Sequence, residues 1–120
     1  MGESILADKS MDFSIRIINL YKHLCKTKME YVLSKQLLRS GTSIGANIRE
    51  ARFAQSKIDF IHKMSISLKE ANESLYWLEL LYKTDYLSES EYMSLYNDCD
   101  ELVRMLHSTV LTSKKKLNES

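Results

Sequence analysis

The sequence predicts an all-α protein folded as an antiparallel, up-down-up-down four-helix bundle, and three observations lead to this fold class. The 120 residues include no proline and only three glycines, so the residues that form tight turns between strands are scarce. Apolar residues recur every three or four positions along four long segments, which is the spacing of an amphipathic helix. The connections between these segments are short, which makes consecutive helices antiparallel neighbours.

The composition predicts a soluble protein with one core. Hydrophobic residues make up 44% of the chain and charged residues 28%, which is ordinary for such a domain. Cys25 and Cys99 fall within helical patterns near apolar faces, where a reduced thiol behaves as a small hydrophobic residue. Because the sequence also shows no signal peptide and no apolar run long enough to cross a membrane, we expect a cytoplasmic protein without a membrane partner.

We expect residues 1–7 to form a flexible tail and residues 8–116 to form the bundle. The first helix of the bundle is expected over about residues 10–26. Asp8 or Ser10 can cap this helix. Its apolar face carries Phe13, Ile17, Leu20, Tyr21 and Leu24, and is widened by Ile15, Ile18 and Cys25.

The second helix is expected over about residues 29–53 and contains two glycines one turn apart, Gly41 and Gly45. Each glycine costs a helix about 1 kcal/mol relative to alanine, so we expect a neighbouring helix to approach closely over the bare backbone. The alternative is that the helix breaks near Ser40 and restarts with Thr42 or Ser43 as its N-cap. The continuous helix is preferred because the apolar residues keep the same phase on both sides of the glycines.

A line of polar residues follows the same helix at intervals of three or four positions. With an acidic partner from the third helix it forms the polar seam: Gln36, Ser40, Ser43, Asn47, Glu50 and Glu73. Serine and asparagine are poor residues for the middle of a helix unless their side chains find partners. We therefore interpret the seam as a buried hydrogen-bond network, in preference to a small-molecule site. Glu73 and Glu70 are the expected partners of Asn47, Arg39 or Arg49.

The third helix is expected over about residues 57–83, capped by Ser56, and it is apolar on two sides. The first side is a complete core stripe, made of Phe60, Ile61, Met64, Leu68, Ala71, Leu75, Leu78 and Tyr82. The second includes four residues that we expect at an oligomer interface: Ile66, Trp77, Leu80 and Leu81. A helix in a lone bundle buries one side, so this pattern predicts self-association. The alternative is an ordinary scatter of exposed apolar residues.

The fourth helix is expected over about residues 88–113. Ser88-Glu89-Ser90-Glu91 forms a capping box at its start, and Lys114-Lys115-Lys116 suits the negative end of its dipole. Residues 117–120 are expected to form a flexible tail.

Two blocks of the sequence resemble a known family. The first contains Arg39-Ser40, Ser43-Ile44, Ala46-Asn47-Ile48 and Glu50-Ala51. The second contains Phe60-Ile61-His62-Lys63, Ile66, Lys69-Glu70-Ala71, Glu73-Ser74 and Tyr76-Trp77-Leu78. Together they resemble the signature of the four-helix-bundle proteins encoded in 23S rRNA intervening sequences, over about residues 10–110.

The resemblance implies an antiparallel bundle that assembles as a ring-shaped homopentamer, and it supplies no catalytic residues. A related branch, the accessory protein of diversity-generating retroelements, is a basic pentameric barrel that binds nucleic acid and a reverse transcriptase. This chain departs from that branch because its net charge is only +1. We expect a non-enzymatic interaction or scaffold module whose partners are copies of itself, with nucleic acid or another protein as further candidates.

Positive charge is concentrated between residues 28 and 57, where six Lys and Arg stand against two Glu. They form the basic stripe: Lys28, Lys35, Arg39, Arg49, Arg52 and Lys57. Repeated around a ring, such a stripe would multiply phosphate contacts, which makes an RNA- or DNA-binding accessory protein the alternative function. The other interpretation is a solvated face with Arg39 or Arg49 held in ion pairs.

Motifs for catalysis are missing from the sequence. His23, His62 and His107 fall on separate helices without paired spacing, and no HExxH, CxxC, GxSxG or phosphate-loop pattern occurs. We expect no enzymatic activity, cofactor, metal ion or small-molecule substrate.

Overall fold

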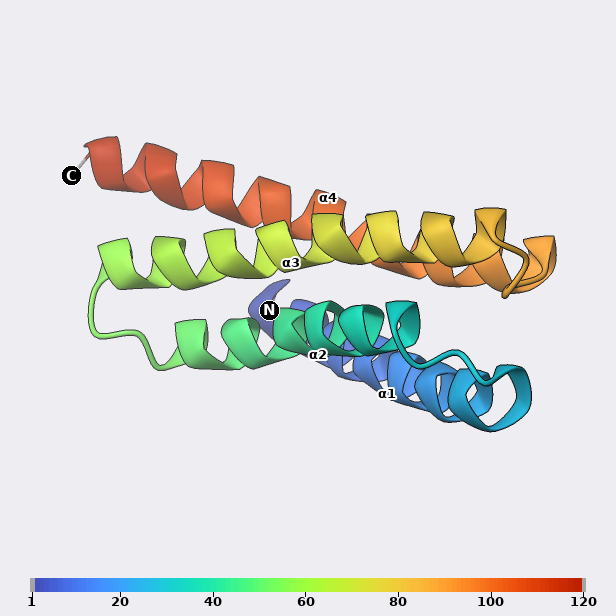
Figure 1. Cartoon of the computed structure of the whole chain (residues 1–120). Helices are drawn as coiled ribbons and strands as arrows, with labels where there is room; N and C mark the ends of the chain where they lie inside the picture. The colour runs from blue at the N-terminus through green and yellow to red at the C-terminus, as the bar shows by residue number, and fades with distance from the viewer. Residues whose placement is uncertain (1, 120) are drawn as a thin grey trace.

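The computed structural model describes residues 2–119, with side chains from residue 5 onward, and consists of four α-helices. They are α1 (Gly2–Lys28), α2 (Leu33–Arg52), α3 (Lys57–Lys83) and α4 (Glu89–Glu119). The helices share one long axis in a molecule of 52 × 22 × 21 Å, with α1 beside α2 and α3 beside α4 (Figure 1). Because no strand occurs within residues 2–119, the expected all-α class is confirmed.

Contacts between helices show that neighbours run antiparallel, because residue numbers rise along one helix while they fall along the next. The pairs are Ser10 with Gly45 and Ile17 with Gly41 between α1 and α2, Glu50 with Lys63 and Arg39 with Glu73 between α2 and α3, and Lys9 with Glu101 and Arg16 with Asp98 between α1 and α4. The expected four-helix bundle is therefore confirmed.

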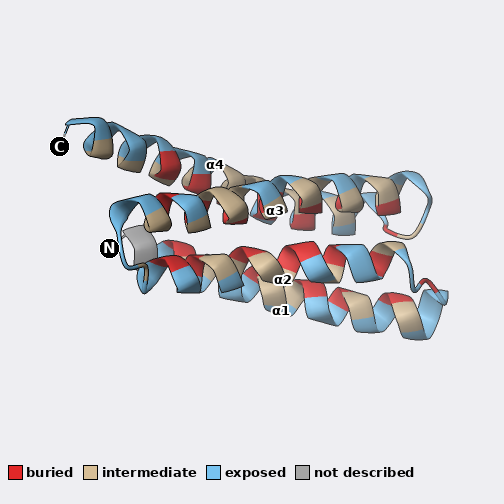
Figure 2. Ribbon diagram, turned by 60° about the vertical axis from the view of Figure 1, so that its left-hand side comes forward, coloured by how far each residue is buried: buried red, intermediate tan, exposed pale blue. Residues whose placement is uncertain are grey.

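The inward faces of all four helices form one core (Figure 2). Its largest fully buried side chains are Leu6, Phe13, Ile17, Leu24, Leu37, Ile44, Ile48, Met64, Leu78, Leu81, Leu102 and Leu106. Helices α1 and α3 are diagonal to each other in the bundle, because each of them has α2 and α4 as its neighbours, and their inward sides meet only through the shared core.

The N-terminal boundary differs from the expectation. Helix α1 begins at Gly2, and Leu6 is only 1% exposed, so the expected tail is wrong for residues 2–7. Leu6 lies seven residues before Phe13 and so continues the buried face by two further turns. Ile15 and Ile18, expected to widen that face, are instead 50% and 37% exposed. At the other end, α4 continues to Glu119, so the expected tail is wrong for residues 117–119; residues 1 and 120 lie outside the described range.

Helix α2 begins at Leu33, four residues later than expected, because Met29 has a left-handed backbone with φ of 55°. The buried Glu30 then caps the helix: its carboxylate accepts hydrogen bonds from the backbone N–H groups of Val32, Leu33 and Ser34 at 3.2, 2.9 and 2.8 Å. Burial alone would raise the pKa of Glu30, but these donors outweigh it and lower the pKa.

Helix α2 runs without interruption through both glycines, so the alternative of a break near Ser40 is excluded. A Cβ atom placed on Gly41 would lie 3.1 Å from Ile17 Cγ1, and one on Gly45 would lie 3.2 Å from Ser10 Oγ. The expected close approach of a neighbouring helix is confirmed, and that neighbour is α1.

The expected caps of the last two helices are also confirmed. Ser56 Oγ accepts a hydrogen bond from the backbone N–H of Asp59 at 3.0 Å. Ser88 and Glu91 bond each other reciprocally: the Ser88 N–H donates to Glu91 Oε1 at 3.0 Å, and the Glu91 N–H donates to Ser88 Oγ at 3.1 Å.

Candidate functional site

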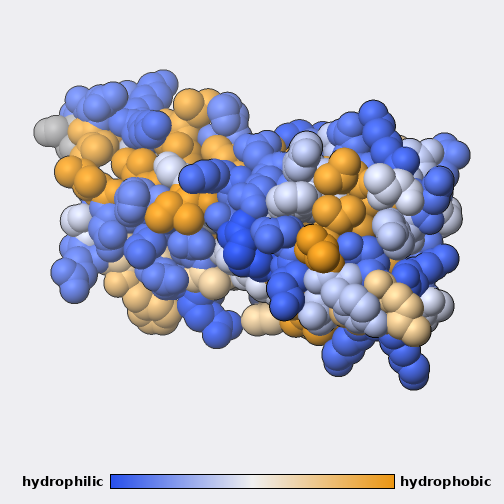
Figure 3. All heavy atoms as spheres, viewed as in Figure 1, coloured by the Kyte–Doolittle hydropathy of each residue, from blue (hydrophilic) through white to orange (hydrophobic). Residues whose placement is uncertain are grey.

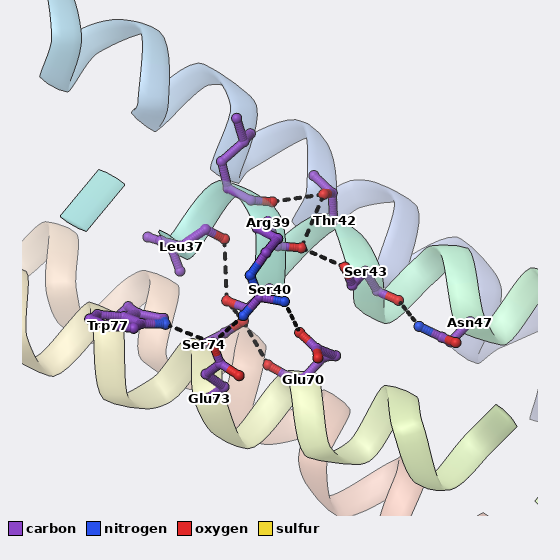
Figure 4. A network of polar contacts seen from close by, with 11 residues as sticks. Leu37, Arg39, Ser40, Thr42, Ser43, Asn47, Glu70, Glu73, Ser74 and Trp77 are labelled. Atoms are coloured by element: carbon purple, nitrogen blue, oxygen red, sulfur yellow. Dashed lines mark hydrogen bonds and ion pairs between the residues drawn. The ribbon is translucent and has the colours of Figure 1, made fainter. Parts of the chain in front are cut away.

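Buried hydroxyl groups join α2 to α3 at the centre of the polar seam. Ser40 and Ser74 are both fully buried, and their Oγ atoms share a hydrogen bond of 2.8 Å (Figure 4). One turn further along, the buried Ser67 donates to the Ile44 carbonyl oxygen at 2.8 Å. The polar pattern of the sequence predicted Ser40 as a member of the seam, but not Ser67 or Ser74. The available signal was that these two serines lie seven residues apart, on the same side as Met64, Ala71 and Leu78.

An ion-pair cluster lies beside these hydroxyls at the surface (Figure 4). Arg39 Nη1 is 3.1 Å from Glu70 Oε2, and Arg39 Nη2 pairs with Glu73, as the sequence analysis predicted. Trp77 Nε1 donates to the same Glu73 Oε1 at 3.1 Å. The Trp77 N–H and then Arg39 lower the pKa of Glu73, although its partial burial opposes them. The cluster fixes the indole of Trp77 against the outer edge of the α2/α3 contact.

The remaining seam residues do not form one continuous buried network. Asn47 Nδ2 donates to the Ser43 carbonyl oxygen of its own helix at 2.8 Å, so the expected contact with Glu73 is not made. Ser43 Oγ likewise donates to the Arg39 carbonyl oxygen at 2.6 Å. Glu50 pairs with Lys63 at 3.2 Å at the surface, and Gln36 is exposed. Of the six seam residues, only Ser40 and Glu73 take part in the hydroxyl and ion-pair contacts that join α2 to α3 around Arg39 and Ser74. Glu50 makes a separate contact with α3 at the surface.

The outer side of α3 carries the α3 strip, which consists of Ile66, Trp77 and Leu80, all half-buried. Leu81, expected with them, is fully buried in the core, and that assignment is wrong. Its position three residues after Leu78 and seven after Ser74 places it on the inward side. On the face drawn in Figure 3, apolar side chains gather in groups separated by polar ones.

A second exposed apolar surface, missed by the sequence analysis, lies on the outer side of α1. The α1 stripe consists of Ile5, Met11, Ile15 and Ile18, between 37% and 50% exposed. Its last three residues follow at intervals of four and three, so they lie on one side of the helix. Met11 also lines a shallow groove between α1 and α2, with small residues such as Ala7, Ser14 and Ala46.

The basic stripe is not continuous. Arg39, in its middle, is neutralised by Glu70 and Glu73. The remaining members are exposed and divide between the ends of α2, which is about 30 Å long. Lys28 and Lys35 lie at its first end, whereas Arg49, Arg52 and Lys57 lie at its last end.

Groups suited to metal binding or thiol chemistry are not assembled within residues 2–119. No group of three or more His, Cys, Asp or Glu side chains there is placed to hold a metal ion, and His23, His62 and His107 are exposed on three different helices. Cys25 and Cys99 are free thiols. Cys99 donates to the Ala71 carbonyl oxygen at 3.3 Å, and burial raises its pKa to about 12, so it remains a protonated packing residue. None of the described helices is long and apolar enough to span a bilayer.

The fold and its surfaces define a protein of the antiparallel four-helix-bundle class. Residues 3–108 match the family model described as 23S rRNA-intervening sequence protein, and the chain belongs to that family. Its fold is similar to the crystal structure, at 1.70 Å resolution, of a protein of unknown function from the S23 ribosomal protein family of Bacteroides thetaiotaomicron VPI-5482. The two share 55% identity and a TM-score of 0.90, over 92% of this chain and 98% of the other. No curated protein matches the chain.

Proposed function

We propose that the chain is a non-enzymatic interaction module that assembles with further copies of itself, by contact between the α1 stripe of one copy and the α3 strip of the next. The observation that carries this proposal is the presence of two separate apolar surfaces, one on the outer side of α1 and one on the outer side of α3, which are the diagonal helices of the bundle. Burying such side chains against a neighbouring copy removes apolar area from water, which favours association by about 25 cal/mol per Å².

Contact between two different surfaces is directional, and it has a structural consequence. A head-to-tail contact repeats from copy to copy and closes into a ring when the rotation permits. The homopentamer implied by the family resemblance is a ring of this kind. Trp77 supports the proposal, because Glu73 and Arg39 hold its indole in place, and a rigid aromatic side chain is a favourable interface residue.

The proposal includes a cytoplasmic location, supported by two free cysteines on different helices.

The test is the hydrodynamic mass of the purified chain and of three variants, measured by light scattering after size-exclusion chromatography. Ile15→Asp damages the α1 stripe, Ile66→Asp damages the α3 strip, and Met93→Asp places the same charge on an exposed apolar position of α4. We expect the wild type and Met93→Asp to form the same assembly and the other two variants to be monomeric.

Mixing the two monomeric variants makes the test specific for a head-to-tail contact. Ile15→Asp retains an intact α3 strip and Ile66→Asp retains an intact α1 stripe, so an equimolar mixture forms one contact and stops at a dimer. A wild-type monomer at high concentration would contradict the proposal, and so would a mixture that remains monomeric. Far-UV circular dichroism verifies that each variant is folded.

A further inference from the structure

Three cationic side chains from three separate helical segments surround one groove at the end of the bundle where α2 turns into α3. The groove is lined by Arg52 at the end of α2, Lys57 at the start of α3 and Lys116 near the end of α4. Figure 1 shows that the α2–α3 connection and the last turns of α4 lie at the same end of the molecule. The groove has a volume of about 370 Å³, and Ala51, Ala54, Phe60 and Ile61 also line it.

Acidic side chains do not neutralise this groove within the described part of the chain. No Asp or Glu of residues 2–119 lines it, and Arg52, Lys57 and Lys116 form no ion pair there. Glu50, the nearest acid on α2, is paired with Lys63. Arg52 and Lys116 each suit the negative end of their own helix, but that role does not require them to meet at one groove.

The most exposed large apolar side chain of the described residues directly follows one of these cations in the chain. Phe53 is 81% exposed, and its chain neighbours Arg52 and Ala54 both line the groove. An aromatic ring held in water at a loop tip gains free energy when a planar partner covers it. The juxtaposition of a cationic groove and an uncovered aromatic ring matches the two elements by which proteins hold an unpaired strand of nucleic acid.

We propose that this groove binds single-stranded nucleic acid, with Arg52, Lys57 and Lys116 contacting successive phosphates while Phe53 stacks on a base. A single strand is selected over a duplex because duplex bases are already stacked and leave no free face for the ring. The three cations line a groove. A groove fits the narrow phosphate backbone of a nucleic acid better than it fits the flat surface of a bilayer. The site differs from the basic stripe: it excludes the paired Arg39 and adds Lys116 and Phe53. It is built within one chain and does not depend on self-association.

Fluorescence anisotropy with labelled oligo(rU) and oligo(dT) of about 20 nucleotides tests this proposal, with the full chain at about 50 and 200 mM salt. The variant Arg52→Gln/Lys57→Gln/Lys116→Gln removes the three groove cations. The matched control, Lys22→Gln/Lys26→Gln/Lys83→Gln, removes the same charge from exposed positions that lie toward the opposite end and outside the basic stripe. We expect the groove variant to weaken binding at least about tenfold and to reduce the slope of log Kd against log salt by about two. The control should change the affinity by less than about twofold.

The stacking contact has its own variant. Phe53→Leu keeps an apolar side chain but cannot stack, so it should weaken binding at least about fivefold. Tyr31→Leu, at an exposed aromatic position of the opposite end, should leave the affinity unchanged. Circular dichroism melting verifies the fold of every variant.

Four results would overturn the proposal: no saturable binding at low salt, equal losses in the groove variant and its control, equal affinity for duplex DNA of the same length, or wild-type affinity in Phe53→Leu. Vesicles containing phosphatidylserine form a further arm. If they bind in a Phe53-dependent manner while the oligonucleotides do not, the site is a membrane contact instead.

Discussion

Helix α2 meets its two neighbours through different chemistry. Toward α1 it presents bare backbone, with Gly41 against Ile17 and Gly45 against Ser10. Toward α3 it presents the Ser40 hydroxyl group and the Arg39 guanidinium group, which bond Ser74 and two glutamates. The first contact depends on shape, whereas the second depends on donors and acceptors. Substitutions should therefore affect the two sides of α2 in different ways.

The α1/α2 contact should be the more sensitive to added volume. Gly41→Leu introduces a side chain where the first new carbon would already lie 3.1 Å from Ile17. We expect a loss of about 3 kcal/mol in the free energy of unfolding, despite the higher helix propensity of leucine, because α1 must move away from α2. Urea unfolding followed by far-UV circular dichroism measures it. All variants are compared at one protein concentration, since self-association contributes to apparent stability.

Ala46→Leu is the control for this substitution, because it adds a comparable volume to an exposed position of the same helix. It should change the free energy of unfolding by less than about 0.5 kcal/mol. Equal losses in both variants would mean that the close approach over Gly41 has no special sensitivity.

The α2/α3 contact should respond to the loss of a hydroxyl group. Ser40→Ala removes its bond to Ser74, but Ser74 still donates to the Glu70 carbonyl oxygen at 2.9 Å. Because no buried donor is orphaned, we expect a loss of about 1 kcal/mol in the free energy of unfolding. Ser43→Ala, which removes a bond within α2 only, should cost less than about 0.5 kcal/mol.

A double-mutant cycle sharpens this prediction. If Ser40 and Ser74 stabilise the contact through each other, Ser40→Ala/Ser74→Ala loses less than the sum of the two single variants. Strictly additive losses would contradict a direct coupling between the two hydroxyls.

The same comparison explains which parts of the fold follow from the sequence. The caps at Ser56 and Ser88, and the span of α3, depend on residues close together in the chain, and the sequence predicts them correctly. Glu30 was missed as a cap because its carboxylate reaches forward from a turn in which Met29 is left-handed. Helix periodicity places a residue on a side but does not tell which neighbour, if any, covers that side.

This limit accounts for the errors at the candidate surfaces. Ile15 and Ile18 have the spacing of a widened core face, yet no helix covers them. Leu81 was grouped with Trp77 and Leu80, but its side of α3 faces the core. The sequence groups only two of the three groove cations, Arg52 and Lys57. Lys116 lies near them because of the position at which α4 packs along the bundle. That position depends on packing between distant segments.

The smallest expected difference between the two sides of α2 is in their pH dependence. The folded-state pKa of Glu73 is lowered, chiefly by the Trp77 N–H and then by Arg39. A lowered pKa means that the ionised form stabilises the fold above the unfolded-state value of about 4.3, and that this stabilisation is lost as pH falls through the folded-state pKa.

Because the cluster is partly exposed and screened by solvent, its contribution is about 0.5 kcal/mol. Glu73→Gln should therefore flatten the fall in the free energy of unfolding between about pH 5 and pH 3. The Gly41→Leu variant, whose changed contact contains no titratable group, should keep the wild-type slope. Equal slopes in wild type and Glu73→Gln would show that the ionised Glu73, with its bonds to Trp77 and Arg39, adds nothing to the stability of the fold.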